Sequence, residues 1–277
     1  MSAAEKRVFL TGGTGFVGSS LIAGAPDDVS IVVLTRDPER FKARSPQLAS
    51  RVELHRGDVT TFEFPAGDFT HVIHGASDTR DAIRDPRAAW TTIVDGTRRV
   101  LELAGSKRFL MISSGAVYSA AGDPYGDAKR AAEELCPEHA AIARLFTFVG
   151  PYMSFDKPFA IVDFIRAATQ GMPIRVQQPE TRRSYLYGSD LARWLWTMLD
   201  RGTGVYDVGS DEVVTMAELA EIVRRVVNPE VAIESGNSGA ATTYVPSIDR
   251  ARRELGLTVD VALDEAIMRT VEWYRQR

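Results

Sequence analysis

The chain has 277 residues, of which 44% are hydrophobic and 25% charged; these proportions are ordinary for a soluble globular protein and argue against disorder as its main state. Its formal net charge of −4 disfavours a nucleic-acid binder, because such proteins carry a basic excess or a basic stripe. One cysteine, and four histidines without metal-ligand spacing, exclude an internal disulfide framework and indicate that the protein has no metal site.

No segment approaches the roughly 20 consecutive apolar residues that a membrane-spanning helix needs. The N-terminus is polar and charged as far as Arg7, and the apolar run that follows is only Val8-Phe9-Leu10. This run is too short for a signal peptide. We therefore expect a cytoplasmic protein that has no membrane partner.

In the first half of the chain, short apolar segments alternate with amphipathic ones. The apolar segments are mostly β-branched or aromatic and predict strands at 7–11, 29–35, 51–55, 71–74, 109–113 and 141–146. The amphipathic segments predict helices at 16–23, 88–104 and 125–137. Such alternation is typical of a doubly wound parallel α/β sheet of the Rossmann type, whose strands are covered on both faces.

After residue 150 the pattern changes to longer helical segments separated by short extended ones. We expect helices at 159–170, 189–200, 215–227 and 262–275, and extended segments at 174–176, 183–187, 204–208 and 231–233. Asp190, Thr215 and Asp264 lie where helix N-caps are expected. The chain is thus predicted to form a dinucleotide-binding domain at 1–150 and a smaller substrate-binding α/β lobe at 151–277. This boundary is approximate, since strands of the second half can return to the main sheet.

A glycine-rich segment at 10–18 ends the first predicted strand and opens the first predicted helix. Small residues let the backbone turn tightly and approach a pyrophosphate, and the helix N-terminus offers free N–H groups and a positive potential. A purely structural turn is the alternative, but a strand–helix junction is the context that favours dinucleotide binding. We expect the cofactor to contact Gly12, Gly15, Phe16, Val17 and Gly18.

The end of the second predicted strand is expected to meet the adenosine ribose, where an acidic residue binds a 2′-hydroxyl group and an arginine binds a 2′-phosphate. Arg36 is the first residue beyond this strand, and Asp37 follows it. We therefore expect NAD(P) as the cofactor, with a preference for NADP(H). A shift of one residue would place Asp37 at the ribose and favour NAD, and a solvated loop charge is the structural alternative for Arg36.

Two further strand ends are candidates for contact with the cofactor. Asp58 and Val59 follow the third predicted strand, where Asp58 either accepts a hydrogen bond from the adenine amino group or stabilises a turn. Gly75 and Ala76 follow the fourth predicted strand and permit close approach of the cofactor. His74, which ends that strand, is expected to be a buried, hydrogen-bonded histidine rather than a catalyst.

The fifth predicted strand leads into Ser114, and Tyr125 and Lys129 follow on a predicted helix. Tyr125 and Lys129 are four residues apart and therefore share one helix face. A tyrosine has a reference pKa near 10, but a nearby ammonium favours its phenolate and a serine hydroxyl holds the reacting oxygen. These three residues predict proton transfer coupled to hydride movement between a carbinol carbon and a nicotinamide, so Tyr125 and Lys129 are also expected to touch the cofactor.

With these motifs the sequence resembles the extended short-chain dehydrogenase/reductases, a family of nucleotide-sugar epimerases, dehydratases and ketoreductases. The resemblance spans nearly the whole chain; its first half is specific for the superfamily and its second half for the nucleotide-sugar branch. It rests on the segments 11–18, 57–58, 113–118, 125–129, 144–151, 171–174, 183–192 and 206–209.

The resemblance implies that Ser114, Tyr125 and Lys129 form the catalytic set and that Arg183 contacts the diphosphate of a sugar nucleotide. Arg250 is a further candidate for contact with the nucleotide. The resemblance also implies a homodimer that pairs through the helices predicted at 88–104 and 125–137.

The chain departs from the family pattern at three places. Family dehydratases often carry an Asp-Glu pair directly after the catalytic Ser or Thr, whereas this chain has Gly115 and Ala116, which disfavours a 4,6-dehydratase of the usual design. Ile93 stands where a family helix signature has an asparagine, so that contact is lost. Only residues 119–124 separate the Val-Tyr motif from Tyr125, which suggests a more open sugar pocket.

The sequence therefore predicts an NAD(P)-dependent enzyme that moves a hydride at C4 of a nucleoside-diphosphate sugar. A cofactor that stays bound and returns the hydride to the opposite face gives 4-epimerisation, whereas a cofactor that exchanges gives a 4-ketoreductase. A 4,6-dehydratase of unusual design and a non-catalytic dinucleotide-binding sensor are the alternatives.

Overall fold

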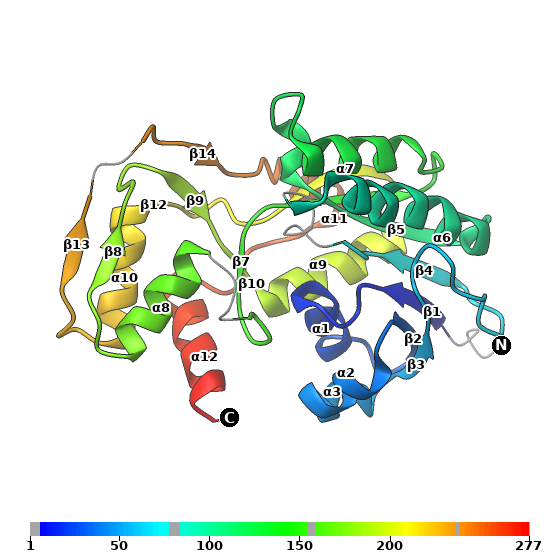
Figure 1. Ribbon diagram of the computed structural model, residues 1–277, viewed down its shortest axis with the longest axis horizontal. Coiled ribbons are helices and arrows are strands. Elements are labelled where there is room, and N and C mark those ends of the chain that lie inside the picture. Colours follow the sequence, from blue (N-terminus) through cyan, green and yellow to red (C-terminus); the bar gives the residue numbers. More distant parts are fainter. Residues whose placement is uncertain (1–5, 78–83, 155–158, 237–238, 277) are drawn as a thin grey trace.

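The computed structural model describes residues 6–77, 84–154, 159–236 and 239–276, and it has two lobes (Figure 1). The larger lobe contains a seven-stranded sheet in the order β11-β6-β5-β4-β1-β2-β3, in which all neighbouring strands are parallel. Its strands are β1 (Lys6–Thr11), β2 (Val29–Thr35), β3 (Glu53–Arg56), β4 (His71–His74), β5 (Arg108–Ser114), β6 (Ala141–Leu145) and β11 (Gly204–Val208). The strand order reverses between β1 and β4, and doubly wound sheets bind their ligands at such a reversal.

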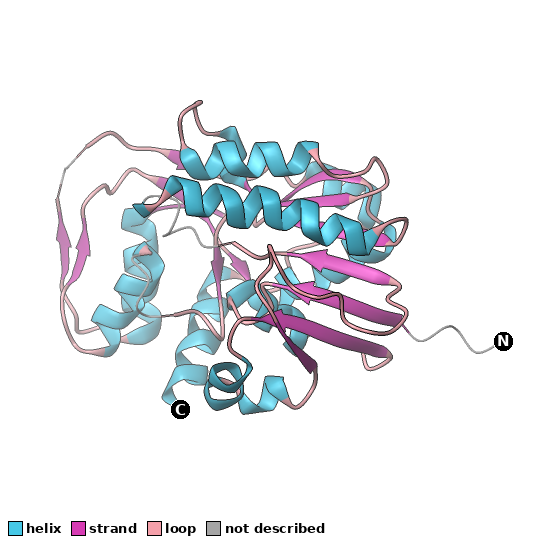
Figure 2. Cartoon of the chain, turned by 45° about the vertical axis from the view of Figure 1, so that its right-hand side comes forward, coloured by secondary structure: helices cyan, strands magenta, loops and turns pink. Residues whose placement is uncertain are grey.

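Helices cover both faces of this sheet (Figure 2). One face packs against α1 (Phe16–Ala23), α2 (Pro38–Arg44), α3 (Pro46–Ala49), α9 (Gly188–Arg201) and α11 (Asp249–Leu255). The other face packs against η1 (Thr91–Asp95), α6 (Gly96–Ala104) and α7 (Pro124–Glu134); α5 (Pro86–Trp90) precedes η1, and the short turn η2 (Gly115–Tyr118) follows β5. Side chains alternate between the two cores, with Val8 and Leu10 in one and Phe9 in the other, as the twofold period of a strand requires. The predicted doubly wound parallel sheet is confirmed.

The smaller lobe has a hydrophobic core of its own. Its helices are α8 (Ala160–Thr169), α10 (Met216–Val227) and α12 (Leu263–Arg275). Its short strands pair as β8 (Ile174–Val176) with β13 (Ile233–Ser235), as β12 (Val213–Thr215) with β9 (Arg182–Ser184) and β14 (Thr243–Tyr244), and as β10 (Leu186–Tyr187) with β7 (Phe148–Val149). In Figure 1 the strands β9 and β14 lie at the top of this lobe, and the chain continues from β14 toward the larger lobe.

Three elements beyond residue 150 belong to the larger lobe, namely α9, β11 and α11. β11 forms the edge of the main sheet and pairs with β6 in parallel, with Val208 level with Leu145. A strand of the second half therefore does return to the main sheet, and the division of the chain at residue 150 stays a prediction.

Of the three expected N-caps, Thr215 caps α10, and its hydroxyl accepts a hydrogen bond of 3.1 Å from the backbone of Glu218 in a capping box. Asp190 and Asp264 lie inside the first turns of α9 and α12. The carboxylate of Asp190 is buried and accepts a bond of 2.9 Å from the backbone of Asp260 instead. The prediction is wrong for these two residues because an acidic residue in the first turn produces the same sequence pattern as a cap.

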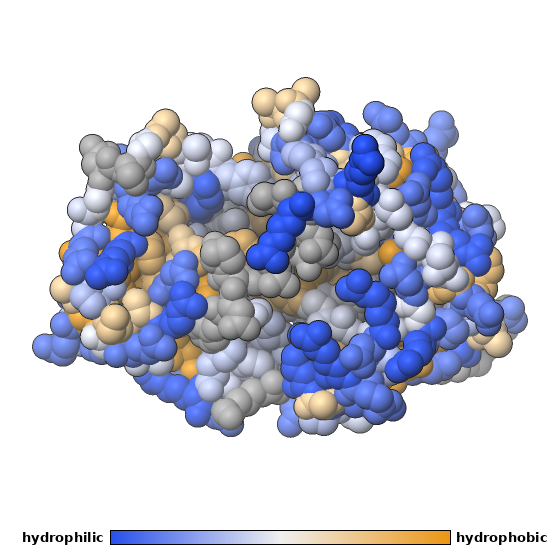
Figure 3. All heavy atoms as spheres, in the orientation of Figure 1, coloured by the Kyte–Doolittle hydropathy of each residue, from blue (hydrophilic) through white to orange (hydrophobic). Residues whose placement is uncertain are grey.

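One face of the molecule is largely polar (Figure 3). Hydrophilic side chains cover most of the face shown in Figure 3. Within the described ranges, no helix has both the length and the hydropathy that crossing a membrane requires.

Candidate active site

The glycine turn between β1 and α1 is packed too closely to hold side chains. Gly12 has a φ of +75°, and a Cβ atom there would lie 2.5 Å from the carbonyl oxygen of Gly75. A Cβ atom on Gly18 would lie 2.3 Å from the Cα atom of Gly13. Gly15 is the N-cap of α1, and an added Cβ atom there would meet no described atom closer than 3.5 Å. The turn is therefore tight on its inner side and open on its outer side.

This open turn fits a dinucleotide. The first four N–H groups of an α-helix have no partner within the helix, and α1 begins at Phe16 directly after the turn. These N–H groups and the positive end of the helix dipole attract a pyrophosphate. The predicted contacts of the cofactor with Gly12, Gly15, Phe16, Val17 and Gly18 are compatible with this geometry and stay predictions.

His74 belongs to a buried network behind the glycine turn. Its ring nitrogens lie 2.8 Å from Oγ1 of Thr11 and 3.0 Å from Oγ1 of Thr97. Burial and, to a lesser extent, the positive charge of Lys129 lower the pKa of His74 to about 3. His74 is therefore neutral and structural, as the sequence analysis expected.

The residues expected at the adenosine ribose lie on the surface beyond β2. Arg36 and Asp37 are both exposed. The carboxylate of Asp37 accepts a hydrogen bond of 3.0 Å from the backbone of Arg40 and caps α2. The backbone and hydroxyl of Thr60 donate to Oδ1 of Asp58 at 3.0 and 2.7 Å. The hydrogen bond from the Thr60 backbone holds the pKa of Asp58 below its usual value, and the nearby charge of Arg36 acts in the same direction.

The other predicted cofactor contacts in this region offer backbone rather than side-chain atoms. Val59 is buried, and a Cβ atom on Gly96 would lie 3.0 Å from its Cγ1 atom. The backbone N–H groups of Gly75 and Ala76 both donate to Oγ1 of Thr11 at 3.2 Å. Contacts of Val59, Gly75 and Ala76 with a cofactor stay predictions. Such contacts would be made by backbone atoms that do not take part in these hydrogen bonds.

The catalytic candidates meet at the N-terminal end of α7. Asp123 caps this helix by accepting a hydrogen bond of 3.3 Å from the backbone of Gly126. A Cβ atom on Gly126 would lie 2.4 Å from the carbonyl oxygen of Ala116, so α7 lies directly against η2. Ser114 caps η2 by accepting a hydrogen bond of 3.1 Å from the backbone of Ala116. This contact between two capped elements brings Tyr125 next to Ser114.

Ser114, Tyr125 and Lys129 form one cluster. The hydroxyls of Ser77 and Ser114 are hydrogen-bonding neighbours of the Tyr125 hydroxyl and lower its pKa. The Nζ atom of Lys129 lies 5.8 Å from the centroid of the Tyr125 ring and donates a hydrogen bond of 2.9 Å to the carbonyl oxygen of Ile112. The structure thus brings the three predicted catalytic residues together. Sequence analysis missed Ser77.

Burial dominates the electrostatics of this cluster. It raises the pKa of Tyr125 to about 12, although the hydrogen bonds with Ser77 and Ser114 lower it. It also lowers the pKa of Lys129 to about 8, although the negative charge of Glu133 raises it. The expectation that the ammonium of Lys129 lowers the pKa of Tyr125 is not met in this structure, because the cost of desolvating the phenolate is the larger effect.

A second tyrosine joins the cluster from the smaller lobe. The hydroxyl of Ser114 is a hydrogen-bonding neighbour of the Tyr244 hydroxyl and lowers its pKa, and the centroid of the Tyr244 ring lies 4.6 Å from that of Phe146. A Cβ atom on Gly115 would lie 2.6 Å from the Tyr244 hydroxyl. Tyr244 was not predicted from the sequence, because it lies in a two-residue strand without a motif. The signal that could have indicated it is Gly115, whose missing side chain leaves room for a residue next to Ser114.

Arg183, expected to bind a diphosphate, lies beside this second tyrosine. Its guanidinium is 5.8 Å from the centroid of the Tyr244 ring, and it donates to the carbonyl and the hydroxyl of Thr242 at 3.1 and 3.0 Å. Tyr244 is thus a neighbour of both Arg183 and Ser114. The contact of Arg183 with a substrate stays a prediction.

Arg250, expected to contact the nucleotide, lies away from the catalytic cluster. Its guanidinium donates to the carbonyls of Thr203 and Val205 at 3.0 and 2.6 Å, where β11 begins. Ser114 is level with the other end of that strand, at Val208, which is about 13 Å further along. Arg250 therefore lies at the amino-terminal end of β11, whereas Ser114 lies at the carboxyl end of β5, and a contact of Arg250 with the nucleotide stays a prediction.

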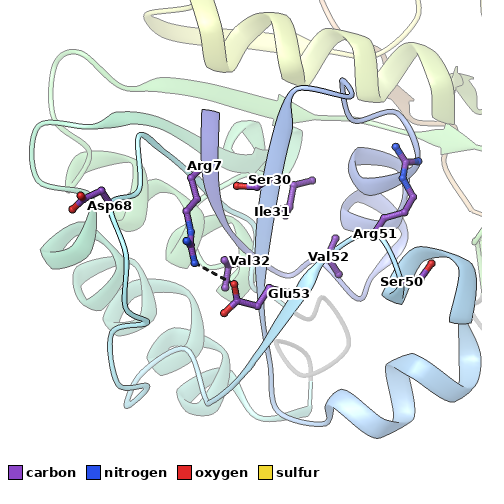
Figure 4. Close-up of a pocket in the computed structure, with 9 residues that line it drawn as sticks. All are labelled: Arg7, Ser30, Ile31, Val32, Ser50, Arg51, Val52, Glu53 and Asp68. Atoms are coloured by element: carbon purple, nitrogen blue, oxygen red, sulfur yellow. Dashed lines mark hydrogen bonds and ion pairs between the residues drawn. The ribbon is translucent and has the colours of Figure 1, made fainter. Parts of the chain in front are cut away.

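The pocket shown in Figure 4 also lies at the amino-terminal ends of the strands. It is lined by Arg7 and Ser30, which are the second residues of β1 and β2, and by the segment that enters β3. Arg7 forms an ion pair of 3.1 Å with Glu53 within it. Since the glycine turn and Ser114 lie at the carboxyl ends of the strands, this pocket is not part of the candidate active site.

The chain thus combines a doubly wound parallel sheet, a tight glycine turn at its reversal point and a cluster of Ser114, Tyr125 and Lys129, a combination typical of dinucleotide-binding α/β proteins. The model of the NAD dependent epimerase/dehydratase family matches residues 8–209. The chain belongs to this family.

Relatives with different printed activities resemble the chain over nearly its whole length. UDP-glucuronic acid decarboxylase 6 of Arabidopsis thaliana is 29% identical, with 98% of this chain and 89% of that protein covered. The dTDP-glucose 4,6-dehydratase of Streptomyces niveus is 25% identical, with 97% and 93% covered. The crystal structure of UDP-glucose 4-epimerase from Thermotoga maritima with UDP-glucose has a TM-score of 0.82 at 19% identity, with 98% and 99% covered, which shows a shared fold.

Proposed function

We propose that the chain is an NAD(P)-dependent enzyme that moves a hydride at C4 of a nucleoside-diphosphate sugar. The observation that carries this proposal is the cluster of Ser114, Tyr125 and Lys129 near the glycine turn. When bound, the dinucleotide supplies the acceptor and donor of the hydride. The named relatives support the substrate class, since their printed names refer to UDP- or dTDP-linked sugars.

Each of the three side chains has a separate role in this proposal. A pKa of about 12 keeps Tyr125 protonated at neutral pH, so it donates its proton to a C4 ketone. The phenolate that this step leaves takes the proton of a C4 hydroxyl in the reverse direction. Ser114 orients the reacting oxygen by a hydrogen bond. Lys129 places a positive charge beside Tyr125 and holds the ribose of the nicotinamide.

The choice among reactions depends on what surrounds the C4 carbonyl. A ketone at C4 is the common starting point of three reactions. It can be reduced from the other face, which gives epimerisation, and it acidifies the hydrogen at C5, which permits elimination of water. In a sugar with a carboxylate at C6, the ketone lies β to that carboxylate, which permits decarboxylation. Gly115 and Ala116 provide no acid or base for elimination of water, and the Tyr244 hydroxyl occupies the space that a side chain at Gly115 would need. We therefore favour 4-epimerisation or 4-ketoreduction over 4,6-dehydration.

Replacement of Tyr125 by Phe tests the proposed reaction. Removal of a proton-transfer group should lower kcat about 100- to 10,000-fold, while cofactor binding, measured by nicotinamide fluorescence, stays within about threefold. The assay follows UDP- and dTDP-linked glucose, galactose and glucuronic acid with NAD and NADP. Tyr206→Phe is the matched control, since it removes a hydroxyl that bonds Glu254 away from the cluster.

The same assay separates the enzyme from a non-catalytic sensor. Equal turnover by the wild type and Tyr125→Phe would overturn the role of Tyr125. Binding of a dinucleotide without turnover of any sugar nucleotide would overturn the proposed enzyme and favour the sensor.

For the cofactor we propose a preference for NADP(H). Arg36 is the first residue beyond β2 and is exposed, whereas the carboxylate of Asp37 is used to cap α2. Arg36→Ala should weaken NADPH about tenfold, as expected for the loss of one charged hydrogen-bonding partner, and leave NADH nearly unchanged. Equal affinities of the wild type for both cofactors would contradict this proposal.

We also propose that two copies pair through the layer of α5, α6 and α7, as the family resemblance implies. Trp90 on α5 leaves 42% of its surface exposed in this layer. Light scattering should give a dimer for the wild type and a weaker dimer for Trp90→Glu. A monomeric wild type would contradict the proposal, and a cytoplasmic location stays an expectation from the sequence.

A further inference from the structure

A largely buried ion pair lies directly behind the catalytic cluster. Arg144 of β6 donates from Nη2 to Oε2 of Glu133 at 2.6 Å and from Nε to Oε1 at 3.0 Å. The side chains of Glu133 and Arg144 are only 9% and 21% exposed. A buried ion pair is weak evidence for a purely stabilising role, because desolvation offsets much of its attraction.

Glu133 stands in line with the catalytic residues of α7. Tyr125, Lys129 and Glu133 are spaced four residues apart, so they lie on one face of the helix. Glu133 is thereby placed one turn from Lys129, on the side away from Tyr125.

Of the described groups that surround Lys129, Glu133 is the one that carries a negative charge. Two residues beyond the end of α7, Cys136 also acts on Lys129, but burial raises the pKa of this thiol to about 12 and keeps it neutral. From β4, His74 is neutral, and from β5 the carbonyl of Ile112 accepts a hydrogen bond. Among the described residues that act on Lys129, Glu133 is therefore the one anion, with Arg144 of β6 as its partner.

The same pair reaches both ends of the segment that contains Ser114. On one side, the hydroxyl of Ser113 donates to Glu133. On the other side, Arg144 donates from Nη1 to the hydroxyl of Tyr118 at 2.9 Å and lies 4.9 Å from its ring. Tyr118 in turn donates to Asp207 at 2.9 Å. The ion pair thus connects α7 to the residues that flank Ser114.

We propose that the ion pair of Glu133 and Arg144 is a positioning unit of the active site: it keeps Lys129 an ammonium ion and holds the Ser114 turn against α7. The inference rests on the proposed function for the catalytic duty of Lys129, but the charge of Lys129 is measurable without substrate or cofactor.

The first test is the titration of Lys129, followed by NMR of lysine labelled with ¹³C at Cε and assigned with Lys129→Met. Glu133→Gln removes the negative charge, so the midpoint of Lys129 should fall by about one pH unit. Glu134→Gln is the matched control, because Glu134 is the next residue of α7 and is exposed; its midpoint should equal that of the wild type. An unchanged midpoint in Glu133→Gln, or an equal shift in Glu134→Gln, would overturn the proposal.

The second test uses turnover. In Glu133→Gln the alkaline limb of kcat/KM should move to lower pH with Lys129, whereas a merely structural role would lower activity equally at every pH. Arg144→Lys retains a cation but loses the planar set of donors, so kcat should fall about 10- to 100-fold with little change in KM or in the midpoint of Lys129. An unchanged kcat in Arg144→Lys would overturn the role in holding Ser114.

The outcomes separate this inference from the proposed function. If no sugar nucleotide is turned over, the proposed function fails, while the NMR titration still decides whether Glu133 sets the charge of Lys129. If both Glu133→Gln and Glu133→Asp fail to fold by circular dichroism, the pair is a folding element and the inference is overturned.

Discussion

His74 and Lys129 are two buried bases that carry different charges at neutral pH. Burial lowers both pKa values, to about 3 for His74 and about 8 for Lys129. At pH 7 His74 is therefore neutral and Lys129 charged, and the charge of Lys129 further disfavours a proton on His74. The buried part of the site thus contains one ammonium ion and no imidazolium ion.

This difference predicts that His74 makes the protein sensitive to acid. In the unfolded chain a histidine titrates near 6.5, whereas in the folded chain His74 titrates near 3. Between these pH values only the unfolded state binds the proton, so stability falls with falling pH, by about 1.4 kcal/mol per pH unit from this group. His74→Gln should therefore flatten the dependence of the unfolding free energy on pH between 6.5 and 4, measured by urea denaturation.

The control for this prediction is His139→Gln, because His139 is exposed. It should retain the pH dependence of the wild type. A slope in His74→Gln equal to that of the wild type would show that His74 does not contribute to acid sensitivity.

At the scale of elements, the sequence predicted what local patterns determine. The bounds of α1, β2 and β4 are those expected, because α1 and β2 are short segments of apolar or small side chains and β4 is a pair of β-branched residues between two histidines. Helices α2 and α3 were not expected, because each begins with a proline, at Pro38 and Pro46. Proline interrupts a helix but fits its first turn, where its missing N–H group is not needed.

The site was predictable where one helix or one turn determines it. The spacing of Tyr125 and Lys129 on a single helix fixed their common face. Tyr244 lies beside Ser114, and Arg250 lies at the amino-terminal end of β11. Both positions depend on how distant parts of the chain pack. No local pattern contains that information.

The contact between α7 and η2 gives a prediction at this scale. In an exposed helix, Gly→Ala stabilises by about 1 kcal/mol, so helix propensity alone predicts that Gly126→Ala is favourable. The added Cβ atom would lie 2.4 Å from the carbonyl oxygen of Ala116, a backbone atom that cannot rotate away. We expect Gly126→Ala to lose about 1 to 3 kcal/mol in urea denaturation and to lower kcat, because α7 moves away from Ser114. A gain in stability would show that this approach is not needed.

At the scale of the whole molecule, the site is completed by both lobes. Ser114 and Gly115 belong to the main sheet and the turn that follows it, whereas Tyr244 belongs to β14, which pairs with β9 of the smaller lobe. The hydroxyl of Tyr244 also lies 3.5 Å from the carbonyl oxygen of Leu145 in β6. The absence of a side chain at Gly115 therefore lets the lobes meet beside the catalytic serine.

This meeting of the lobes predicts a coupling between Gly115 and Tyr244. In Gly115→Ala the new Cβ atom would lie 2.6 Å from the Tyr244 hydroxyl and 2.9 Å from Phe146, so we expect a loss of about 1 to 3 kcal/mol in urea denaturation. Tyr244→Leu alone should also destabilise, through lost ring packing. Because Leu withdraws the atoms nearest to the new Cβ, the double variant should lose less than the sum of the single losses, by at least about 0.5 kcal/mol. Strict additivity would mean that these two residues do not meet in solution, and that the second tyrosine has no place beside Ser114.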